Sequence, residues 1–209
     1  MKSAQISAID LLPCFPLIYP DFLSAHEHKK MLLFLTEEAS SFGALGGTED
    51  YWKGRTLSVA DIKNATIRQM LINTRDRAIA LLSAALTEHL GSEHKLYSDL
   101  VNFARWPMGY ELQPHADSEN PNGVPHPFPW RHFGSVTYLN DDYAGGEIYF
   151  PNLDLELKPN PRTLIIFPGT LKYLHGVRKI TSGMRHTTAS FMTFDASKHD
   201  GYGQIRTPL

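Results

Sequence analysis

The chain has 209 residues, of which 42% are hydrophobic and 20% are charged, and its formal net charge is −2. This size and composition predict one globular domain and exclude global disorder, and the near balance of charge gives no basis for a nucleic-acid or membrane partner. A single cysteine, Cys14, excludes a disulfide framework within the chain and a multi-cysteine metal site.

The start of the chain lacks the features of a targeting segment. The stretch MKSAQISAIDLLPCFPLIYPDF contains Asp10 and three prolines, so no unbroken apolar region precedes a cleavage site. No apolar run approaches the roughly 18 residues that a membrane-spanning helix needs. We therefore expect a cytoplasmic protein, and the sequence leaves its oligomeric state open.

The first 95 residues carry the helix signals. Ser24 and Glu27 have the spacing of a capping box before an apolar face. A second helix is predicted to end near Gly91. Between the two helices, the glycine-rich stretch 41–57 predicts a loop or a short strand. The apolar face of the second helix is formed by Ile67, Leu71, Ala78, Leu82 and Leu86.

After about residue 95 the pattern changes to short segments that are rich in β-branched and aromatic residues. Eight such segments without helices between them predict a double-stranded β-helix, or jelly roll, or else a β-barrel. We expect an α+β fold in a single domain, 1–209, with mainly helical support over 1–95 and a jelly-roll core over 96–196. The eight segments are LVNFARW, GYELQPHAD, HFGSVTYLN, GGEIYFP, LDLELKP, RTLIIFPG, YLHGVRKI and RHTTASFMTF.

Two histidines and one aspartate suggest a metal site. On a strand, residues two apart point to the same face, so His115 and Asp117 can converge on one ion. His175, near the end of the chain, is the candidate third ligand, because a jelly roll brings distant strands together. Two imidazoles and one carboxylate form the facial triad of non-haem Fe(II) oxygenases.

An arginine strengthens this interpretation. Arg185 lies ten residues after His175 and follows Gly183, which is expected to turn the chain into its last strand. A guanidinium binds a carboxylate through two hydrogen bonds, which lysine does less well. Arg185 is therefore suited to hold the distal carboxylate of 2-oxoglutarate.

From about Arg105 to Asp195 the chain resembles the 2-oxoglutarate/Fe(II) dioxygenase superfamily, in its prolyl 4-hydroxylase-like branch. The motifs RWPMGYELQPHAD, YLNDDYAGGEIYFP, RTLIIFPG and HGVRKITSGMR occur in the family's order. The resemblance implies that His115, Asp117 and His175 bind Fe(II), and that Arg185 and Tyr138 bind 2-oxoglutarate. It also implies dioxygen as a cosubstrate and ascorbate as an accessory reductant.

Some positions depart from the family pattern. Trp106 and Leu112 stand where tyrosine is common, which removes two hydroxyls near the pocket. Arg185 stands where some relatives, including collagen-type prolyl hydroxylases, have lysine. This last difference favours a protein unlike the collagen type.

Three further residues are candidates for contact with the substrate. Arg55, in KGRTL, resembles an arginine in the substrate region of prolyl hydroxylases, and Arg131 matches a recurring arginine before the Tyr138 strand. Trp130 belongs to the proline-rich loop SENPNGVPHPFPWRHFG, which we interpret as a lid or a wall of the substrate site.

The resulting prediction is an Fe(II)- and 2-oxoglutarate-dependent dioxygenase that hydroxylates a prolyl residue in a peptide or protein and releases succinate and CO2. A hydroxylase of a free amino acid or another small metabolite is the alternative, and a closed pocket with a second charged clamp would favour it. A third hypothesis is a non-catalytic jelly-roll module that only binds metal.

Overall fold

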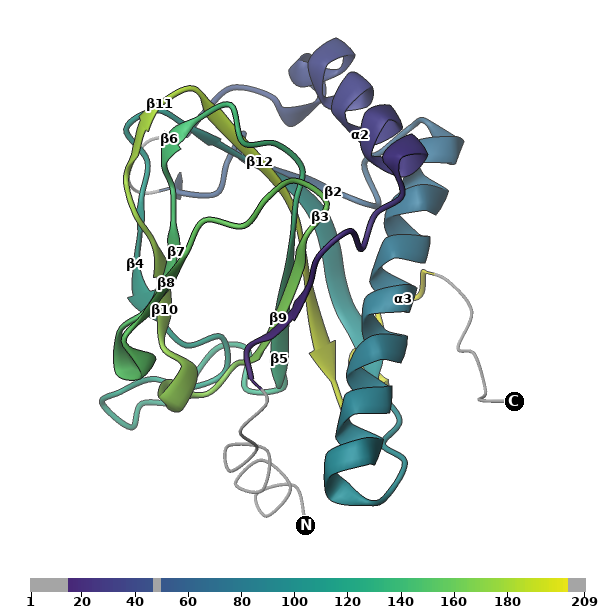
Figure 1. Ribbon diagram of the computed structural model, residues 1–209, viewed down its shortest axis with the longest axis vertical. Coiled ribbons are helices and arrows are strands. Elements are labelled where there is room, and N and C mark those ends of the chain that lie inside the picture. Colours follow the sequence, from purple (N-terminus) through teal and green to yellow (C-terminus); the bar gives the residue numbers. More distant parts are fainter. Residues whose placement is uncertain (1–14, 47–49, 203–209) are drawn as a thin grey trace.

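The structure is a computed structural model that describes residues 15–46 and 50–202. Two antiparallel β-sheets face each other, and helices cover the outer face of the larger sheet (Figure 1). This is the predicted α+β jelly roll. Cys14 lies outside the described residues.

The larger sheet has six strands, and its edges come from the N-terminal part of the chain. Each of its neighbouring strands runs antiparallel. The two N-terminal strands therefore extend a sheet whose centre was predicted from the later segments. In order, the strands are β1 (Leu17–Tyr19), β9 (Leu164–Pro168), β5 (Phe133–Tyr138), β12 (Met184–Thr193), β3 (Tyr97–Pro107) and β2 (Thr56–Ser58).

The smaller sheet has four strands and carries two of the predicted metal ligands. In order, its strands are β4 (Leu112–His115), β10 (His175–Val177), β7 (Ile148–Phe150) and β8 (Leu155–Leu157). A two-stranded sheet joins β11 (Ile180–Ser182) to β6 (Ala144–Gly145). Short 3-10 helices are η1 (Ala39–Phe42), η3 (Pro151–Leu153), η4 (Leu171–Tyr173) and η5 (Ala196–Lys198).

Strand β9 shows why the central segments are continuously apolar. Leu164 and Ile166 pack in a cluster with residues of α3 (Ala65–Leu90). Ile165 and Phe167 pack instead against residues of β7, between the two sheets. Because successive side chains of a strand point to opposite faces, a strand that is buried on both faces needs an unbroken apolar run.

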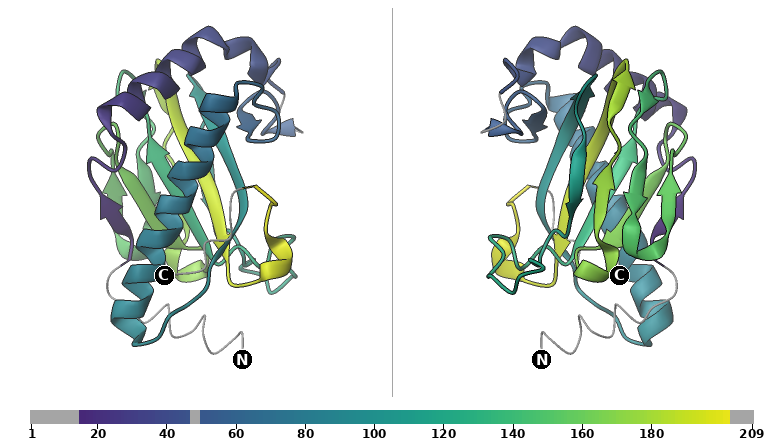
Figure 2. Two further views of the ribbon diagram at one scale, coloured as in Figure 1. Left: turned by 90° about the vertical axis from the view of Figure 1, so that its right-hand side faces the viewer. Right: turned by 90° about the vertical axis from the view of Figure 1, so that its left-hand side faces the viewer.

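One end of each of the two long helices lies where a capping residue predicts it. In α2 (Ala25–Glu37) the Ser24 side chain accepts from the Glu27 backbone N–H, and the Glu27 side chain accepts in return from the Ser24 backbone N–H. Helix α3 ends at Gly91, which adopts a left-handed φ of 70°. Figure 2 shows α3 lying along the outer face of the larger sheet.

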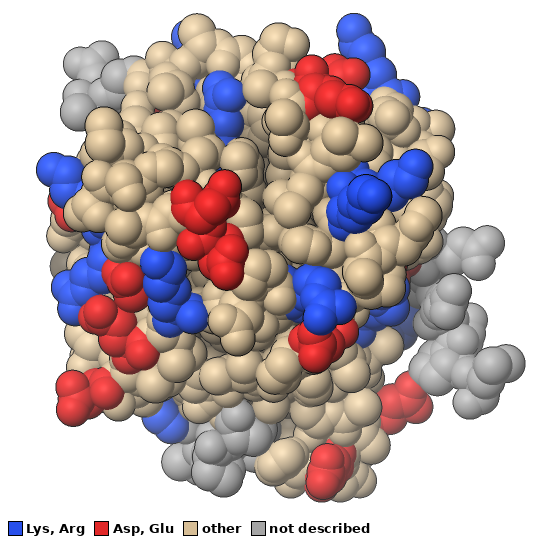
Figure 3. All heavy atoms as spheres, turned by 45° about the horizontal axis from the view of Figure 1, so that its top comes forward, with Lys and Arg blue, Asp and Glu red and all other residues tan. Residues whose placement is uncertain are grey.

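Basic and acidic side chains are interspersed on the face that Figure 3 shows, in keeping with the small net charge. Within the described ranges, the helices are too short or too polar to cross a membrane.

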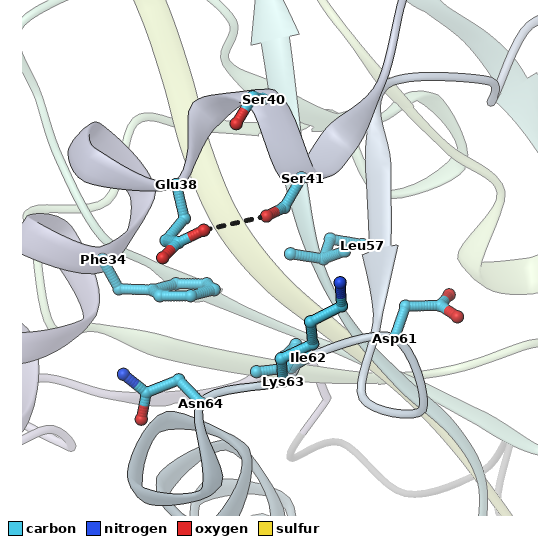
Figure 4. A pocket seen from close by; sticks show the side chains of 9 residues that line it. All are labelled: Phe34, Glu38, Ser40, Ser41, Leu57, Asp61, Ile62, Lys63 and Asn64. Carbon is cyan, nitrogen blue, oxygen red and sulfur yellow. Dashed lines mark hydrogen bonds between the residues drawn. The ribbon is translucent and has the colours of Figure 1, made fainter.

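A cleft of about 440 Å³ opens between η1, β2 and the turn that precedes α3 (Figure 4). Glu38 and Ser41 form a hydrogen bond at its rim, and Lys63 and Asp61 lie on the other side. Its lining contains none of the predicted metal or 2-oxoglutarate residues.

Candidate active site

Strand pairing brings the two candidate histidine ligands together. His115 ends β4 and His175 begins β10, and the two are direct partners in the antiparallel register. Partners of this kind project to the same face of a sheet. Their imidazole rings accordingly lie with centroids 4.4 Å apart. The pairing of β4 with β10 thus brings together two histidines that are 60 residues apart in the sequence.

Asp117 completes the cluster from just beyond the strand. Its Oδ1 lies 3.7 Å from His115 Nε2 and 3.9 Å from His175 Nε2. All three candidate ligand atoms lie within 4.8 Å of one another. The predicted convergence is therefore found, although strand β4 ends at His115 and Asp117 occupies a bend.

Backbone hydrogen bonds set the orientation of both imidazoles. His115 Nδ1 donates to the carbonyl of Gln113 and His175 Nδ1 donates to that of Tyr173, each at 3.1 Å. The Nε2 lone pair of each ring is thereby left free toward Asp117. Burial also lowers the pKa of His175 to about 4, against the opposing effect of the Asp117 carboxylate, so this ring is neutral at physiological pH.

The surroundings of Asp117 fit a metal ion. Asp117 Oδ2 is buried and has no hydrogen-bond partner within the described part of the chain. A buried carboxylate oxygen without a partner is costly unless a cation binds it. Two neutral imidazoles and one carboxylate are also the donor set for Fe(II). These three residues would hold the ion.

Two glycines leave room for the Asp117 side chain. A Cβ on Gly134 would lie 2.6 Å from Asp117 Oδ2, and a Cβ on Gly169 would lie 3.1 Å from Asp117 Cβ. The carbonyl of Gly169 also accepts from the backbone N–H and the hydroxyl of Ser118. The backbone of this region therefore fixes where the carboxylate can lie.

A second group of polar side chains surrounds Arg185, near the start of β12. Its guanidinium carbon lies 4.9 Å from the centroid of the Tyr138 ring, and both residues are almost fully buried. Arg185 Nε and the Tyr138 hydroxyl have no hydrogen-bond partner among residues 15–46 and 50–202. These unpaired donors suit a carboxylate, which offers about four acceptor sites.

Tyr143 joins this group and was not predicted from the sequence. Its buried hydroxyl has no hydrogen-bond partner in the described ranges, and burial raises its pKa to about 12 while Arg185 opposes that rise. Burial likewise raises the pKa of Tyr138, again opposed by Arg185. A Cβ on Gly146 would lie 3.0 Å from Tyr143 and 3.2 Å from Arg185. The turn at Gly145 and Gly146, here called the Gly-Gly turn, therefore permits this approach.

Trp106 lies beside the same group. It is the register partner of Arg185 across β3 and β12, and the Arg185 guanidinium carbon is 5.3 Å from its ring. Trp106 Nε1 is buried and unpaired within the described part of the chain. Trp106 lacks the hydroxyl of the tyrosine that is common in the family at this position, but its indole N–H is a buried donor in the same place.

The match to a known family covers this whole region. Residues 101–193 match the model of the 2OG-Fe(II) oxygenase superfamily. The matched segment, rather than the whole chain, is assigned to this superfamily. This superfamily uses Fe(II), 2-oxoglutarate and dioxygen, as the sequence analysis predicted for this chain. The donor set of His115, Asp117 and His175 fits the iron.

Prolyl hydroxylases provide the sequence relatives of this oxygenase. It is 32% identical over 76 residues to prolyl 3-hydroxylase 2 of Homo sapiens and to prolyl 3-hydroxylase 1 of Gallus gallus. The aligned part is 34% of this chain, but only 11% and 10% of those proteins. The oxygenase thus spans about a tenth of the length of the curated relatives that it matches.

Prolyl hydroxylases also share its fold. The viral collagen prolyl hydroxylase of Paramecium Bursaria Chlorella virus-1 has a TM-score of 0.62 and 17% identity, with 86% of this chain and 95% of that chain covered. A Trichoplax adhaerens prolyl hydroxylase, solved with a hypoxia inducible factor peptide fragment, has a TM-score of 0.64 and 17% identity, with 97% and 95% covered. These neighbours agree with the predicted jelly-roll fold.

Trp130 and Arg131 of the oxygenase have partners within the loop and the sheet. Arg131 Nε donates to Asp99 Oδ2 at 2.8 Å, and its guanidinium carbon lies 3.9 Å from the ring centroids of both Phe128 and Phe191. The Lys198 ammonium lies 4.0 Å from the Trp130 ring. In the structure, both residues contact other parts of the same chain. Their contact with a substrate therefore stays a prediction.

Proposed function

We propose that this oxygenase is a dioxygenase that hydroxylates a prolyl residue in a peptide or protein. The observation that carries the proposal is the convergence of His115, Asp117 and His175 in a fold that also buries Arg185. Two tyrosine hydroxyls beside Arg185 have no hydrogen-bond partner among the described residues. The prolyl hydroxylase relatives support the substrate class. The chain, 1–209, would act as a single catalytic unit.

The residues have separate roles in this proposal. His115, Asp117 and His175 would hold Fe(II), while Arg185 and Tyr138 would bind the distal carboxylate of 2-oxoglutarate. Fe(II) held there would supply the redox chemistry that couples oxidation of a substrate C–H bond by dioxygen to decarboxylation of 2-oxoglutarate, with the hydroxylated product, succinate and CO2 as the products. The protein's own part is to orient these groups and to keep water away from them.

Hydroxylation of a free amino acid or small metabolite is the second candidate. One observation favours it, namely a second arginine, Arg55, that is buried and unpaired among the described residues. A small charged substrate would need such a clamp. For the leading candidate, we propose that the substrate is a peptide or protein and that the enzyme acts in the cytoplasm.

The test is succinate formation with Fe(II), 2-oxoglutarate, ascorbate and air. Proline-rich peptides and free proline are added separately, and the products are separated into 3- and 4-hydroxyproline. His115→Ala and Arg185→Ala should both abolish turnover. Calorimetry without turnover should show that His115→Ala loses Mn(II) binding and that Arg185→Ala loses 2-oxoglutarate binding. Binding of both without succinate from any substrate would instead support a non-catalytic module.

A further inference from the structure

Arg55 is a buried cation without a hydrogen-bond acceptor in the described part of the chain. It is 1% exposed, and its three guanidinium nitrogens have no hydrogen-bond partner among the residues that the structure describes. Four aromatic rings surround it. Its guanidinium carbon lies 3.7 Å from the ring centroid of Tyr51, 4.4 Å from that of Trp106, 4.7 Å from that of Trp52 and 4.8 Å from that of Tyr110. We call this arrangement the Arg55 cage.

The rings stabilise the charge but leave its donors unused. Aromatic faces attract a guanidinium through their quadrupoles. They do not replace acceptors for its five N–H groups, which form a planar fork. Burial also lowers the pKa of Arg55, because leaving water penalises the charged form. The group that matches the fork is a carboxylate, which accepts two parallel hydrogen bonds.

The cage borders the candidate active site. Trp106 contacts both arginines, because its ring centroid lies 4.4 Å from the Arg55 guanidinium carbon and 5.3 Å from that of Arg185. Trp106 also belongs to a cluster that contains Val177 and Leu112, which pair with each other in the sheet that carries the ligands. Leu112 precedes His115 by three residues, which is roughly 10 Å along a strand.

One wall of the cage faces solvent. Trp52 is 45% exposed although its ring lies against both Arg55 and Trp106. Tyr51 is held differently, because its hydroxyl donates to the carbonyl of Glu111, in the turn before β4. Trp52 is therefore the most exposed ring of the cage, since Tyr51 and Tyr110 are half-buried and Trp106 is buried.

We propose that the Arg55 cage binds a carboxylate of the substrate, next to the site of oxidation. The proposal rests on the proposed function and adds a substrate class to it. The carboxylate can be the α-carboxylate of a free amino acid or chain end, or the side chain of an acidic residue near a prolyl residue. Arg185 serves the cosubstrate, and Arg55 serves the molecule that is oxidised.

The experiment measures binding without turnover, by calorimetry on protein loaded with Mn(II) and 2-oxoglutarate. Two matched pairs of probes differ only in charge. The first pair is N-acetyl-L-proline and N-acetyl-L-prolinamide. The second is a pair of blocked tetrapeptides that carry glutamate or glutamine beside the proline. Each probe is titrated into the wild type, Arg55→Met and Arg55→Lys.

We expect the charged member of one pair to bind the wild type about 10- to 100-fold more tightly than its neutral partner, as a charge-assisted pair allows. Arg55→Met should abolish that preference and leave the neutral partner unaffected, and Arg55→Lys should retain part of it. The pair that shows the effect identifies the source of the carboxylate.

Several outcomes would overturn the inference. They are a preference that persists in Arg55→Met, equal binding within both pairs, and failure of every carboxylate probe to bind. Loss of 2-oxoglutarate affinity in Arg55→Met would assign the cage to the cosubstrate instead. Failure of the proposed function is distinguishable, because it would appear as no binding of Mn(II) or 2-oxoglutarate by the wild type.

Discussion

Asp117 and Gly134 are in such close contact that the glycine has no space for a side chain. A Cβ at Gly134 would lie 2.6 Å from Asp117 Oδ2 and 2.9 Å from the Phe167 ring. Gly134 is the second residue of β5 in the larger sheet, whereas Asp117 follows β4 in the smaller one. The position of the carboxylate ligand thus depends on the backbone of the opposite sheet.

Gly134→Ala should therefore displace Asp117. We expect Mn(II) affinity to fall at least about 10-fold and the free energy of unfolding to fall by about 1–3 kcal/mol, as for other overpacked sites. Calorimetry and urea denaturation measure the two effects. Gly91→Ala is the control, since a left-handed φ of 70° makes it destabilising without touching the metal site. Unchanged metal affinity in Gly134→Ala would contradict the prediction.

Tyr143→Phe should weaken the binding of 2-oxoglutarate. The variant removes one buried hydroxyl beside Arg185, so we expect the Kd for 2-oxoglutarate on Mn(II)-loaded protein to rise about 5- to 10-fold. Tyr97→Phe removes a hydroxyl at the opposite end of β3 from Trp106 and should have no effect. Equal affinities for the wild type and Tyr143→Phe would remove Tyr143 from the site.

Arg185→Lys should retain the positive charge but lose the planar pair of guanidinium N–H donors. A lysine presents a point charge rather than a planar pair of donors, so we expect about a 10-fold rise in the Kd for 2-oxoglutarate. Arg178→Lys is a matched control, because Arg178 is exposed and pairs with Glu156. If Arg185→Lys bound 2-oxoglutarate like the wild type, the guanidinium geometry would not be used.

Zinc should inhibit the enzyme by occupying the iron site. A site of given N and O ligands generally binds Zn(II) more tightly than Fe(II). One equivalent of Zn(II) should therefore suppress succinate formation, and Asp117→Ala should lose high-affinity zinc binding, as calorimetry can measure. Full turnover in the presence of bound, stoichiometric zinc would place the zinc somewhere else.

Stability should fall in mild acid in part because of His186. Burial lowers the pKa of this imidazole, against an opposing effect of Asp142. Below about pH 6.5, its ordinary pKa, the unfolded chain takes up a proton that the folded protein resists, so folding becomes less favourable as the pH falls. The urea midpoint should drop more between pH 7.5 and pH 5.5 for the wild type than for His186→Gln. Parallel slopes would contradict this assignment.

The sequence was informative wherever a local rule applied. The capping box at Ser24, the helix stop at Gly91 and the two-residue spacing of His115 and Asp117 each depend on neighbours in the chain, and each was found in the structure. Alternation and apolar runs likewise gave all eight core segments. For the short strand β2 the sequence allowed either a loop or a strand, because three residues carry too little pattern.

Tertiary structure alone decided which distant residues share a site. The register that pairs His115 with His175, and the Gly-Gly turn that brings Tyr143 to Arg185, join residues whose separation in the chain carries no signal. The same holds for Arg55, whose four rings come from two distant parts of the chain, 51–52 and 106–110. By itself the sequence determined the ligand types, the helices and the strand segments, since those follow from local chemistry. Which donors are left buried and unpaired follows only from packing.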